Sequence, residues 1–290
     1  MLHSFPTPYR NELWYSVMYR HMVRNGSLST MEGRMKEVSF SVLYDKSIAR
    51  VVSELPKDTF MVEDLVMKHT LFPYITRTYS FERKKRYLNA LIAESISTIS
   101  WNASAKIPTC LKYCPICRKE ELERYGECYW HREHQLPLVT ICPEHGCRLI
   151  WFRNKANRYN ALGFEEEPLF DTELYENALA SISYQYLTDP FHVCPPSENE
   201  GLFLALEKGG YASVKKGRML TVDPELLYKD MLEFYGEKLV KRYFSGQVTH
   251  EHLLKIKNWL FEEPERYIMV SALVEKDTNC SLGEAKIHSA

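Results

Sequence analysis

Two short strings, Cys114-Pro115-Ile116-Cys117 and Cys142-Pro143-Glu144-His145, decide how this sequence of 290 residues folds. In each string two metal-binding residue types stand three positions apart, so one turn of the chain can aim both side chains at a common point. The 24 residues between Cys117 and Cys142 suffice for a short helix or hairpin that brings the strings together. The spacing therefore predicts one structural Zn²⁺ with Cys114, Cys117, Cys142 and His145 as its four tetrahedral ligands.

Chance spacing, a redox thiol pair and a core without metal compete with zinc at these strings. A redox pair is expected between a strand and a helix that begins at the motif, and the preceding Lys106-Ile107-Pro108 does not favour a strand. Cys110, Cys128 and Cys147 could each replace a ligand. None of them has a partner at the same spacing, however, and buried thiols are common in any case.

The compartment affects how the cysteines are interpreted. The chain begins without the basic and apolar regions of a signal peptide, and no run approaches the roughly 18 apolar residues of a membrane helix. We therefore expect a cytoplasmic protein without membrane contact. In a reducing compartment clustered cysteines are more often metal ligands than disulfides, and six of the eight cysteines lie within 38 residues.

A catalytic zinc is a further alternative, because His131-Arg132-Glu133 has the H-x-E pattern of zinc nucleobase deaminases. Those enzymes place Pro-Cys-x-x-Cys downstream of the pattern, whereas here the Cys-x-x-Cys string lies upstream. Four paired protein ligands also leave no open coordination position for a substrate or water. We therefore predict that the protein is not an enzyme, and we place His131 and His134 on one short helix.

The charge distribution restricts nucleic-acid binding to local patches. Lys and Arg number 37 against 38 Asp and Glu, which excludes a uniformly basic surface. Residues 106–160 contain ten basic and six acidic residues, whereas residues 161–190 contain seven acidic and no basic ones. A solvated surface and contacts to DNA phosphates explain the basic excess equally well. The predicted phosphate contacts are Lys112, Arg118, Lys119, Arg124, Arg132, Arg153, Lys155 and Arg158.

The apolar residues outside the cysteine-rich segment recur at helical spacing, which predicts a mainly α fold. Asn11 is the predicted N-cap of the first helix and Gly26 its left-handed end, and Asp223 is the predicted cap of a later helix. The expected helices cover 13–25, 46–55, 61–69, 80–99, 251–261 and 264–275. Two more are expected, one after a capping box of Ser29 and Glu32 and one that begins at Pro224 and has Leu227, Met231 and Phe234 as its apolar stripe.

These patterns predict helical bundles with helix-turn-helix-like elements around a small Cys3His zinc-finger module. The expected organisation is an N-terminal helical domain over 1–104, the zinc-finger module over 105–160 and a C-terminal helical domain over 161–290. The last domain contains a helix-turn-helix candidate in its two final helices, although plain bundle packing explains the same apolar pattern.

Several strings resemble the TniQ family and, within it, its TnsD-like target selectors. They are Tyr113-Cys114-Pro115-Ile116-Cys117, Tyr125-Gly126-Glu127, Tyr129-Trp130, His134-Gln135-Leu136-Pro137 and Cys142-Pro143-Glu144-His145-Gly146. Phe5-Pro6-Thr7-Pro8-Tyr9 and His69-Thr70-Leu71-Phe72-Pro73 agree with the same family. The resemblance is firm over about residues 5–150 and weaker as far as Trp259-Leu260.

The resemblance implies a non-catalytic bacterial protein of DNA transposition, which binds double-stranded DNA at an insertion site and recruits an AAA+ regulator of the TnsC type. It places the metal ligands on the same four residues that the spacing indicates. The alternative is an adaptor that joins the AAA+ regulator to a separate targeting complex without direct DNA binding. A homodimer is a further expectation, and TnsD-like members typically extend beyond this length, so the chain is expected to be a shorter relative or to end early.

Overall fold

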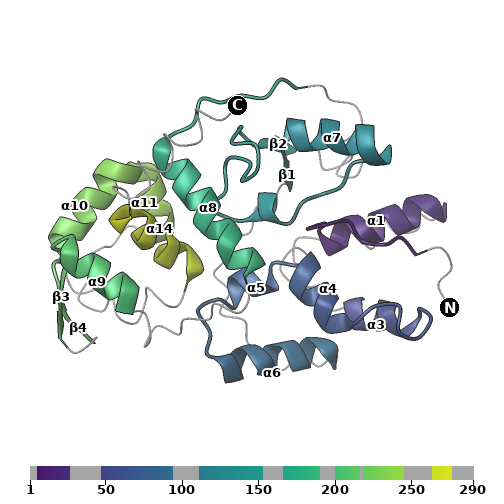
Figure 1. Ribbon diagram of the computed structural model, residues 1–290, viewed down its shortest axis with the longest axis horizontal. Helices are drawn as coiled ribbons and strands as arrows, with labels where there is room; N and C mark the ends of the chain where they lie inside the picture. Colours follow the sequence, from purple (N-terminus) through teal and green to yellow (C-terminus); the bar gives the residue numbers. More distant parts are fainter. Residues whose placement is uncertain are drawn as a thin grey trace.

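The structure of the protein is a computed structural model that describes residues 5–26, 47–93, 111–152, 166–189, 200–215, 218–244 and 263–275. Within these ranges the fold is mainly α-helical, as predicted, with two short antiparallel pairs of strands (Figure 1). No helix in these ranges is long and apolar enough to cross a membrane.

The elements follow the chain in three groups. The N-terminal group consists of α1 (Trp14–Arg24), α3 (Ser47–Ser53), α4 (Val62–His69), α5 (Phe72–Ile75) and α6 (Phe81–Ile92). The central group, which carries the cysteine strings, consists of β1 (Leu111–Tyr113), α7 (Pro115–Tyr125), the 3₁₀ helix η3 (Glu133–Gln135) and β2 (Ile150–Phe152). The last group consists of α8 (Leu174–Thr188), α9 (Glu200–Lys208), β3 (Ala212–Lys215), β4 (Arg218–Val222), α10 (Pro224–Tyr235), α11 (Glu237–Phe244) and α14 (Pro264–Val274).

The helix ends test the predicted caps. Asp223 accepts hydrogen bonds from the backbone of Glu225 and Leu226 and caps α10, as predicted, and Gly26 has the expected left-handed φ of 65° after α1. The prediction for Asn11 was wrong, because Leu13 is the N-cap of α1 and no side chain caps this end. Asn11 instead takes a left-handed φ of 55°, and its Oδ1 accepts hydrogen bonds from Arg132. The predicted helix over 251–261 and the one after the capping box of Ser29 and Glu32 lie outside the described residues.

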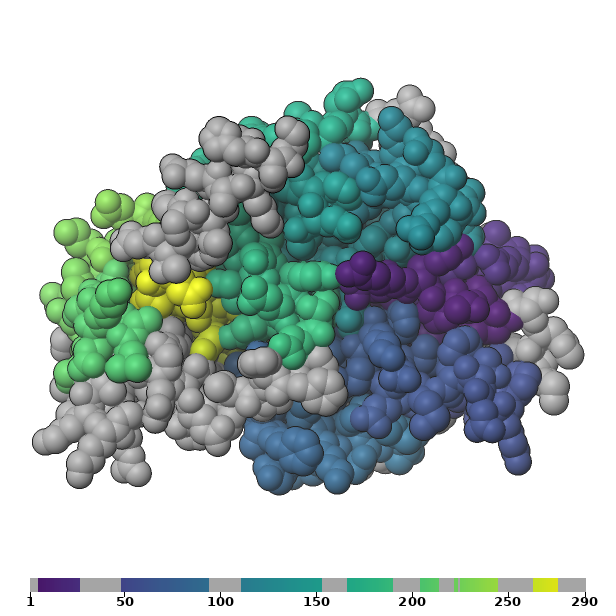
Figure 2. All heavy atoms as spheres, in the orientation of Figure 1, coloured from purple at the N-terminus to yellow at the C-terminus, as the bar shows by residue number. Residues whose placement is uncertain are grey.

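The first helices share a small apolar core. Trp14 and Val17 on one face of α1 pack with Ile48, Leu65 and Phe72 from α3, α4 and α5. Tyr15 and Met22 on the opposite face of α1, together with its N-cap Leu13, belong to a second, larger core that extends through the cysteine-rich segment to α14. Figure 2 shows the purple N-terminal segment between the blue helices and the teal central group. The domain boundaries at residues 104 and 160 stay predictions. Residues of this larger core lie on both sides of each boundary.

Helix α8 lies at the centre of the molecule, between the N-terminal helices and the other helices of the last group (Figure 1). It packs against α5 on one side and α14 on the other. Helix α14 is almost entirely buried, and Ile268, Met269 and Val270 have no exposed surface. The last group is therefore a bundle built around α14 and is joined to the rest of the protein through α8.

Glu265 is a charged residue inside this junction. Its side chain, on α14, is 2% exposed and lies near the Tyr74 hydroxyl of α5. Burial raises the pKa of the Glu265 carboxyl from 4.5 to about 7, because the charged form loses its hydration. The folded protein therefore holds this proton at pH values where the unfolded chain has released it.

We predict that Glu265→Gln removes part of the pH dependence of stability. Between pH 4.5 and pH 7 the native protein binds more protons at residue 265 than the unfolded chain, so its stability falls as the pH rises, by on the order of 3 kcal/mol in total. The glutamine variant lacks this loss. Its gain in stability over the parent should therefore be larger at pH 8 than at pH 5. Urea denaturation at both pH values measures the difference, with the exposed Glu225→Gln as control, and parallel curves for parent and Glu265→Gln would contradict it.

Candidate metal centre

The first cysteine string lies at the junction of β1 and α7. Cys114 is the N-cap of α7, Pro115 occupies the first helical position, and the backbone N–H of Cys117 points at the Cys114 sulfur, 3.4 Å away. Proline suits this position, because its missing N–H has no partner there anyway. The positive end of the helix dipole also favours a thiolate at the cap.

The second string forms a tight turn that ends at Gly146. The N–H of Gly146 donates to the carbonyl of Cys142 and the N–H of Cys142 donates to the carbonyl of Cys147, each at 2.8 Å. Gly146 has a φ of 68°, a conformation that residues with a Cβ rarely adopt. The antiparallel pairing of β1 with β2, with Leu111 opposite Phe152, then holds the two strings side by side.

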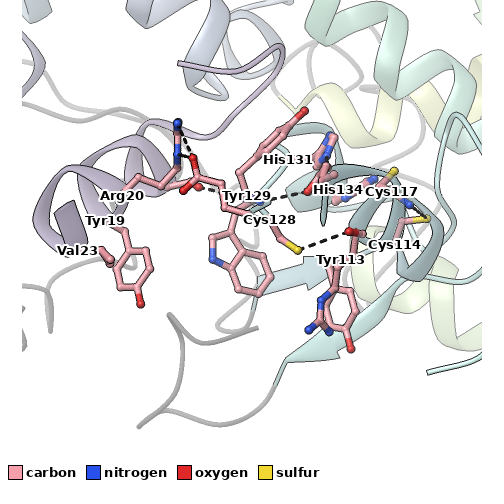
Figure 3. A pocket seen from close by; sticks show the side chains of 15 residues that line it. Tyr19, Arg20, Val23, Tyr113, Cys114, Cys117, Cys128, Tyr129, His131 and His134 are labelled. Carbon is pink, nitrogen blue, oxygen red and sulfur yellow. Dashed lines mark hydrogen bonds and ion pairs between the residues drawn. The ribbon is translucent and has the colours of Figure 1, made fainter. Parts of the chain in front are cut away.

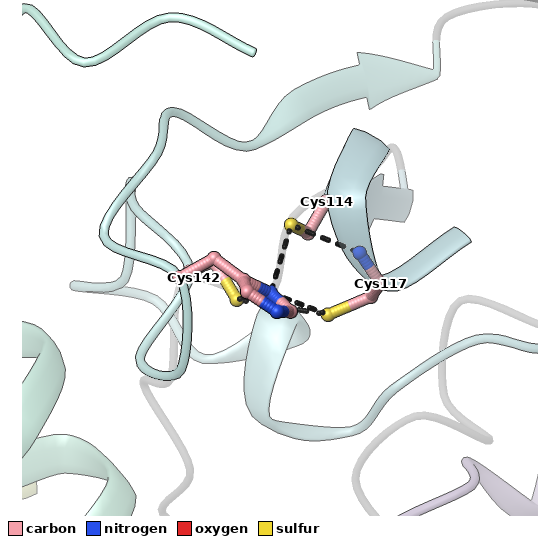
Figure 4. Close-up of side chains that lie close together, drawn as sticks. Cys114, Cys117 and Cys142 are labelled. Carbon is pink, nitrogen blue, oxygen red and sulfur yellow. Dashed lines mark hydrogen bonds between the residues drawn. The ribbon is translucent and has the colours of Figure 1, made fainter. Parts of the chain in front are cut away.

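The four predicted ligands converge at one point (Figure 4). The His145 Nδ1 lies 3.6, 3.3 and 3.6 Å from the sulfurs of Cys114, Cys117 and Cys142, and the Cys117 and Cys142 sulfurs are 3.7 Å apart. Ligands held about 2.1–2.3 Å from a tetrahedral Zn²⁺ are about 3.5–3.8 Å from one another. The distances therefore fit a metal ion of this size, and the group is one that could hold it.

Three further residues adjoin this cluster, and the spacing of the two strings predicts none of them there. The Glu120 Oε2 is 3.4 Å from Nε2 of His145, a position from which a carboxylate orients a ligating imidazole. The His134 Nε2 is 3.5 Å from the Cys142 sulfur, and the Cys147 sulfur is 3.4 Å from that of Cys114. Cys128 lies apart, with its thiol 3.5 Å from the carbonyl of Arg118. Of the three residues that adjoin the cluster, only Cys147 has a sequence position that indicates this, because it follows Cys142 by five residues.

One argument against a redox pair was wrong. A strand, β1, does precede Cys114-Pro115-Ile116-Cys117, and a helix, α7, does begin there. The local geometry of the string therefore does not separate a redox pair from a metal site. The convergence of Cys142 and His145 on the same point is what favours a metal, since a redox pair needs neither residue.

The H-x-E string has a structural place (Figure 3). His131 lies between Glu121, which contacts its Nε2, and Glu133, whose Oε1 is 3.0 Å from its Nδ1. Burial alone would lower the pKa of His131, but the hydrogen bonds to the two carboxylates raise it to about 10. His131 is therefore a buried cation that joins α7 to η3. The prediction of one short helix for both histidines was wrong, because only His134 lies in η3.

The predicted phosphate contacts fall into three sets: buried residues, exposed residues and residues outside the described ranges. Lys112, Arg118 and Arg132 are at most 7% exposed, so in this conformation they cannot reach a DNA backbone. Lys119 and Arg124 lie on the exposed face of α7. Arg153, Lys155 and Arg158 lie outside the described residues. Charge counting along the chain cannot separate buried from exposed cations.

The buried cations bind carbonyl groups that lie outside regular secondary structure or at its ends. Lys112 Nζ donates to the carbonyls of Leu136 and Val139, and Arg132 Nη1 donates to those of Met67 and Thr70. Burial lowers the pKa of Lys112 from 10.5 to about 7. These bonds fasten the loop after η3 and attach the central group to the end of α4.

A further ion network joins the central group to α1. Arg20 of α1 contacts Glu12 at 2.7 Å and Glu127 at 3.0 Å, and Glu127 also accepts hydrogen bonds from Arg24 and Tyr9. Glu12 has no exposed surface, and burial raises its pKa to about 7 even though Arg20 lowers it. Next to this network a cavity of about 130 Å³ lies between α1 and α7, lined among others by Tyr19, Arg20 and Trp130 (Figure 3).

The helices before the cysteine strings and the strings themselves match one known family. The model of the TniQ family matches residues 3–149, a range that begins before α1 and ends just after the second cysteine string. The chain belongs to the TniQ family. Transposon Tn7 transposition protein TnsD of Escherichia coli is 29% identical to this TniQ-family chain over 181 residues, which cover 57% of the chain. The chain spans only about a third of that relative, since the match covers 35% of its length.

We predict that Arg20→Met destabilises the protein by about 3–5 kcal/mol, because it leaves the buried Glu12 carboxylate without its cation. The loss should be greatest above pH 7, since at lower pH Glu12 can take up a proton. Arg24→Met is the control: Arg24 contacts the same Glu127 from an exposed position and should contribute less than about 1 kcal/mol. Equal losses in the two variants, measured by urea denaturation, would contradict this assignment.

Proposed function

We propose that this chain is a non-catalytic selector of insertion sites in DNA transposition, which binds double-stranded DNA and recruits an AAA+ regulator of the TnsC type. The observation that carries the proposal is the TniQ family match over residues 3–149. The relative from transposon Tn7 is named a transposition protein, which supports the same proposal. A cytoplasmic location in a bacterium and a homodimer belong to the same proposal.

The metal in this proposal is one structural Zn²⁺. Three thiolates and one imidazole form a donor set that suits zinc, and the three cysteines are buried. Four protein ligands complete a tetrahedron and leave no position for a reacting group. The role of the ion is then to hold β1, α7 and the Cys142–His145 turn together, and its binding free energy becomes part of the free energy of folding.

Removing a ligand should therefore remove the metal. We predict that Cys114→Ser and His145→Ala each lose stoichiometric zinc and destabilise the central group by about 3 kcal/mol or more, because structural zinc contributes on the order of 10–16 kcal/mol of binding free energy. Cys128→Ser is the matched control, since its thiol lies outside the cluster. Elemental analysis and thermal melting measure both effects, and full zinc content with unchanged melting in the ligand variants would refute the site.

Of the predicted DNA contacts that lie within the described residues, Lys119 and Arg124 are the ones that remain exposed. Both are exposed on α7 beyond Cys117, so the metal cluster would fix their position relative to the rest of the module. The burial of Lys112, Arg118 and Arg132 favours the alternative, an adaptor that joins the AAA+ regulator to a separate targeting complex without touching DNA.

Salt-titrated DNA binding separates these two functions. A direct binder loses affinity steeply as salt rises, and Lys119→Ala/Arg124→Ala should reduce the slope of log K against log salt by about 2, since each phosphate contact contributes about 0.9. The matched control is Lys85→Ala/Arg86→Ala, an exposed basic pair on α6. Negligible binding of the parent protein at every salt concentration would support the adaptor, and an equal effect of the two double variants would refute the α7 contact.

A further inference from the structure

The segment that leads into the first residue of α8, residues 166–174, has an unusual surface, and we call it the acidic strap. Its side chains Leu169, Phe170 and Leu174 are 59%, 61% and 72% exposed. Single exposed apolar residues are ordinary on a protein surface, but three large ones within six positions are a local concentration of exposed apolar area, a feature of interaction sites. In Figure 1 this segment runs along the upper edge of the molecule to the start of α8.

The strap is held in place by the metal-binding module. The backbone N–H of Arg148, three residues after His145, donates to the carbonyl of Leu169 at 2.8 Å. The Arg148 side chain contacts Asp171 at 2.8 Å and Glu176 at 2.9 Å, and Thr140 also donates to Glu176 at 2.7 Å. The apolar side chains are thus exposed on an anchored backbone, which reduces the entropy that the strap would lose when a partner binds.

The charge of the strap limits what can bind it. Glu166, Glu167 and Glu173 are exposed, and Glu173 also accepts a backbone hydrogen bond in the capping box of α8. Asp171 pairs with Arg148, which also contacts Glu176, and the described residues 166–189 contain no Lys or Arg. The phosphates of DNA would be repelled by this surface. A partner chain that carries both apolar side chains and cations would be attracted to the strap. Such a partner would cover the two leucines and the phenylalanine and would pair with the carboxylates.

We propose that the acidic strap is a docking surface for a basic, apolar peptide segment of a protein partner. Leu169, Phe170 and Leu174 supply the buried area, and Glu166, Glu167 and Glu173 select a segment rich in Lys or Arg. This surface is separate from the exposed basic residues of α7, so the proposal stands or falls independently of DNA binding.

The test uses the full chain and a random dodecapeptide library displayed on phage. Peptides selected on the parent protein should be enriched in Lys and Arg together with large apolar residues. In solution, Phe170→Ser/Leu174→Ser should weaken the binding of the selected peptides at least about tenfold, because it removes apolar area that the peptide would bury. Glu166→Gln/Glu167→Gln should weaken their binding more at low salt than at high salt, because it removes an attraction that salt screens.

The matched control is Phe81→Ser on α6, which removes an apolar side chain 66% exposed beside the basic Lys85 and Arg86. It should leave peptide binding unchanged, and melting curves of all variants verify that they fold. The proposal is overturned if selection yields no peptides, if the peptides lack basic residues, or if the strap and control variants bind them equally. It is also overturned if the strap variants convert a dimer of the parent into monomers, since the occupant would then be a second copy of this chain.

Discussion

The structure depends on bringing four side chains from two separate turns to one point in the protein. Cys114 and Cys117 are fixed by the start of α7, and Cys142 and His145 by a turn that needs the positive φ of Gly146. The β1 and β2 pairing places these two turns next to each other. A metal ion at their centre would add its binding free energy to the stabilisation from the apolar core that extends through this segment.

Around this point, buried charged side chains form hydrogen bonds with backbone carbonyl groups that have no partner within regular secondary structure. Lys112 binds a backbone carbonyl of the loop after η3, Arg132 binds one at the end of α4, and His131 lies between Glu121 and Glu133. Arg20 contacts both Glu12 and Glu127 and so connects α1 to the module. Because an unpaired buried charge is costly, each of these contacts restricts the module to one arrangement relative to the N-terminal helices. The family match covers both parts, which fits their tight connection.

Burial of these cations leaves Lys119 and Arg124 as the exposed cations of α7, next to the exposed Glu120 and Glu123, so this side of the helix carries no net positive charge. Lys119 and Arg124 lie on α7, and the acidic strap lies along the start of α8, anchored by Arg148 to the chain that follows His145. In the proposed function, Lys119 and Arg124 would contact individual DNA phosphates, and the acidic strap would attract a basic protein segment. A protein that marks a DNA site and recruits a partner needs two such non-competing surfaces, and the same metal cluster would orient both.

Local patterns along the chain are enough to predict the convergent ligand set, the mainly helical fold and several helix ends, because these follow from spacing, apolar periodicity and cap chemistry over a few residues. Asp223 at α10 and Gly26 after α1 are examples. Tertiary packing, in contrast, sets the role of Asn11, which contacts Arg132 across 121 positions, and the burial of Lys112 and Arg118. Glu120 and His134 beside the cluster have no local signal either. The reason is physical: whether a charged side chain is exposed or buried depends on which distant segments pack against it, and no local pattern records that.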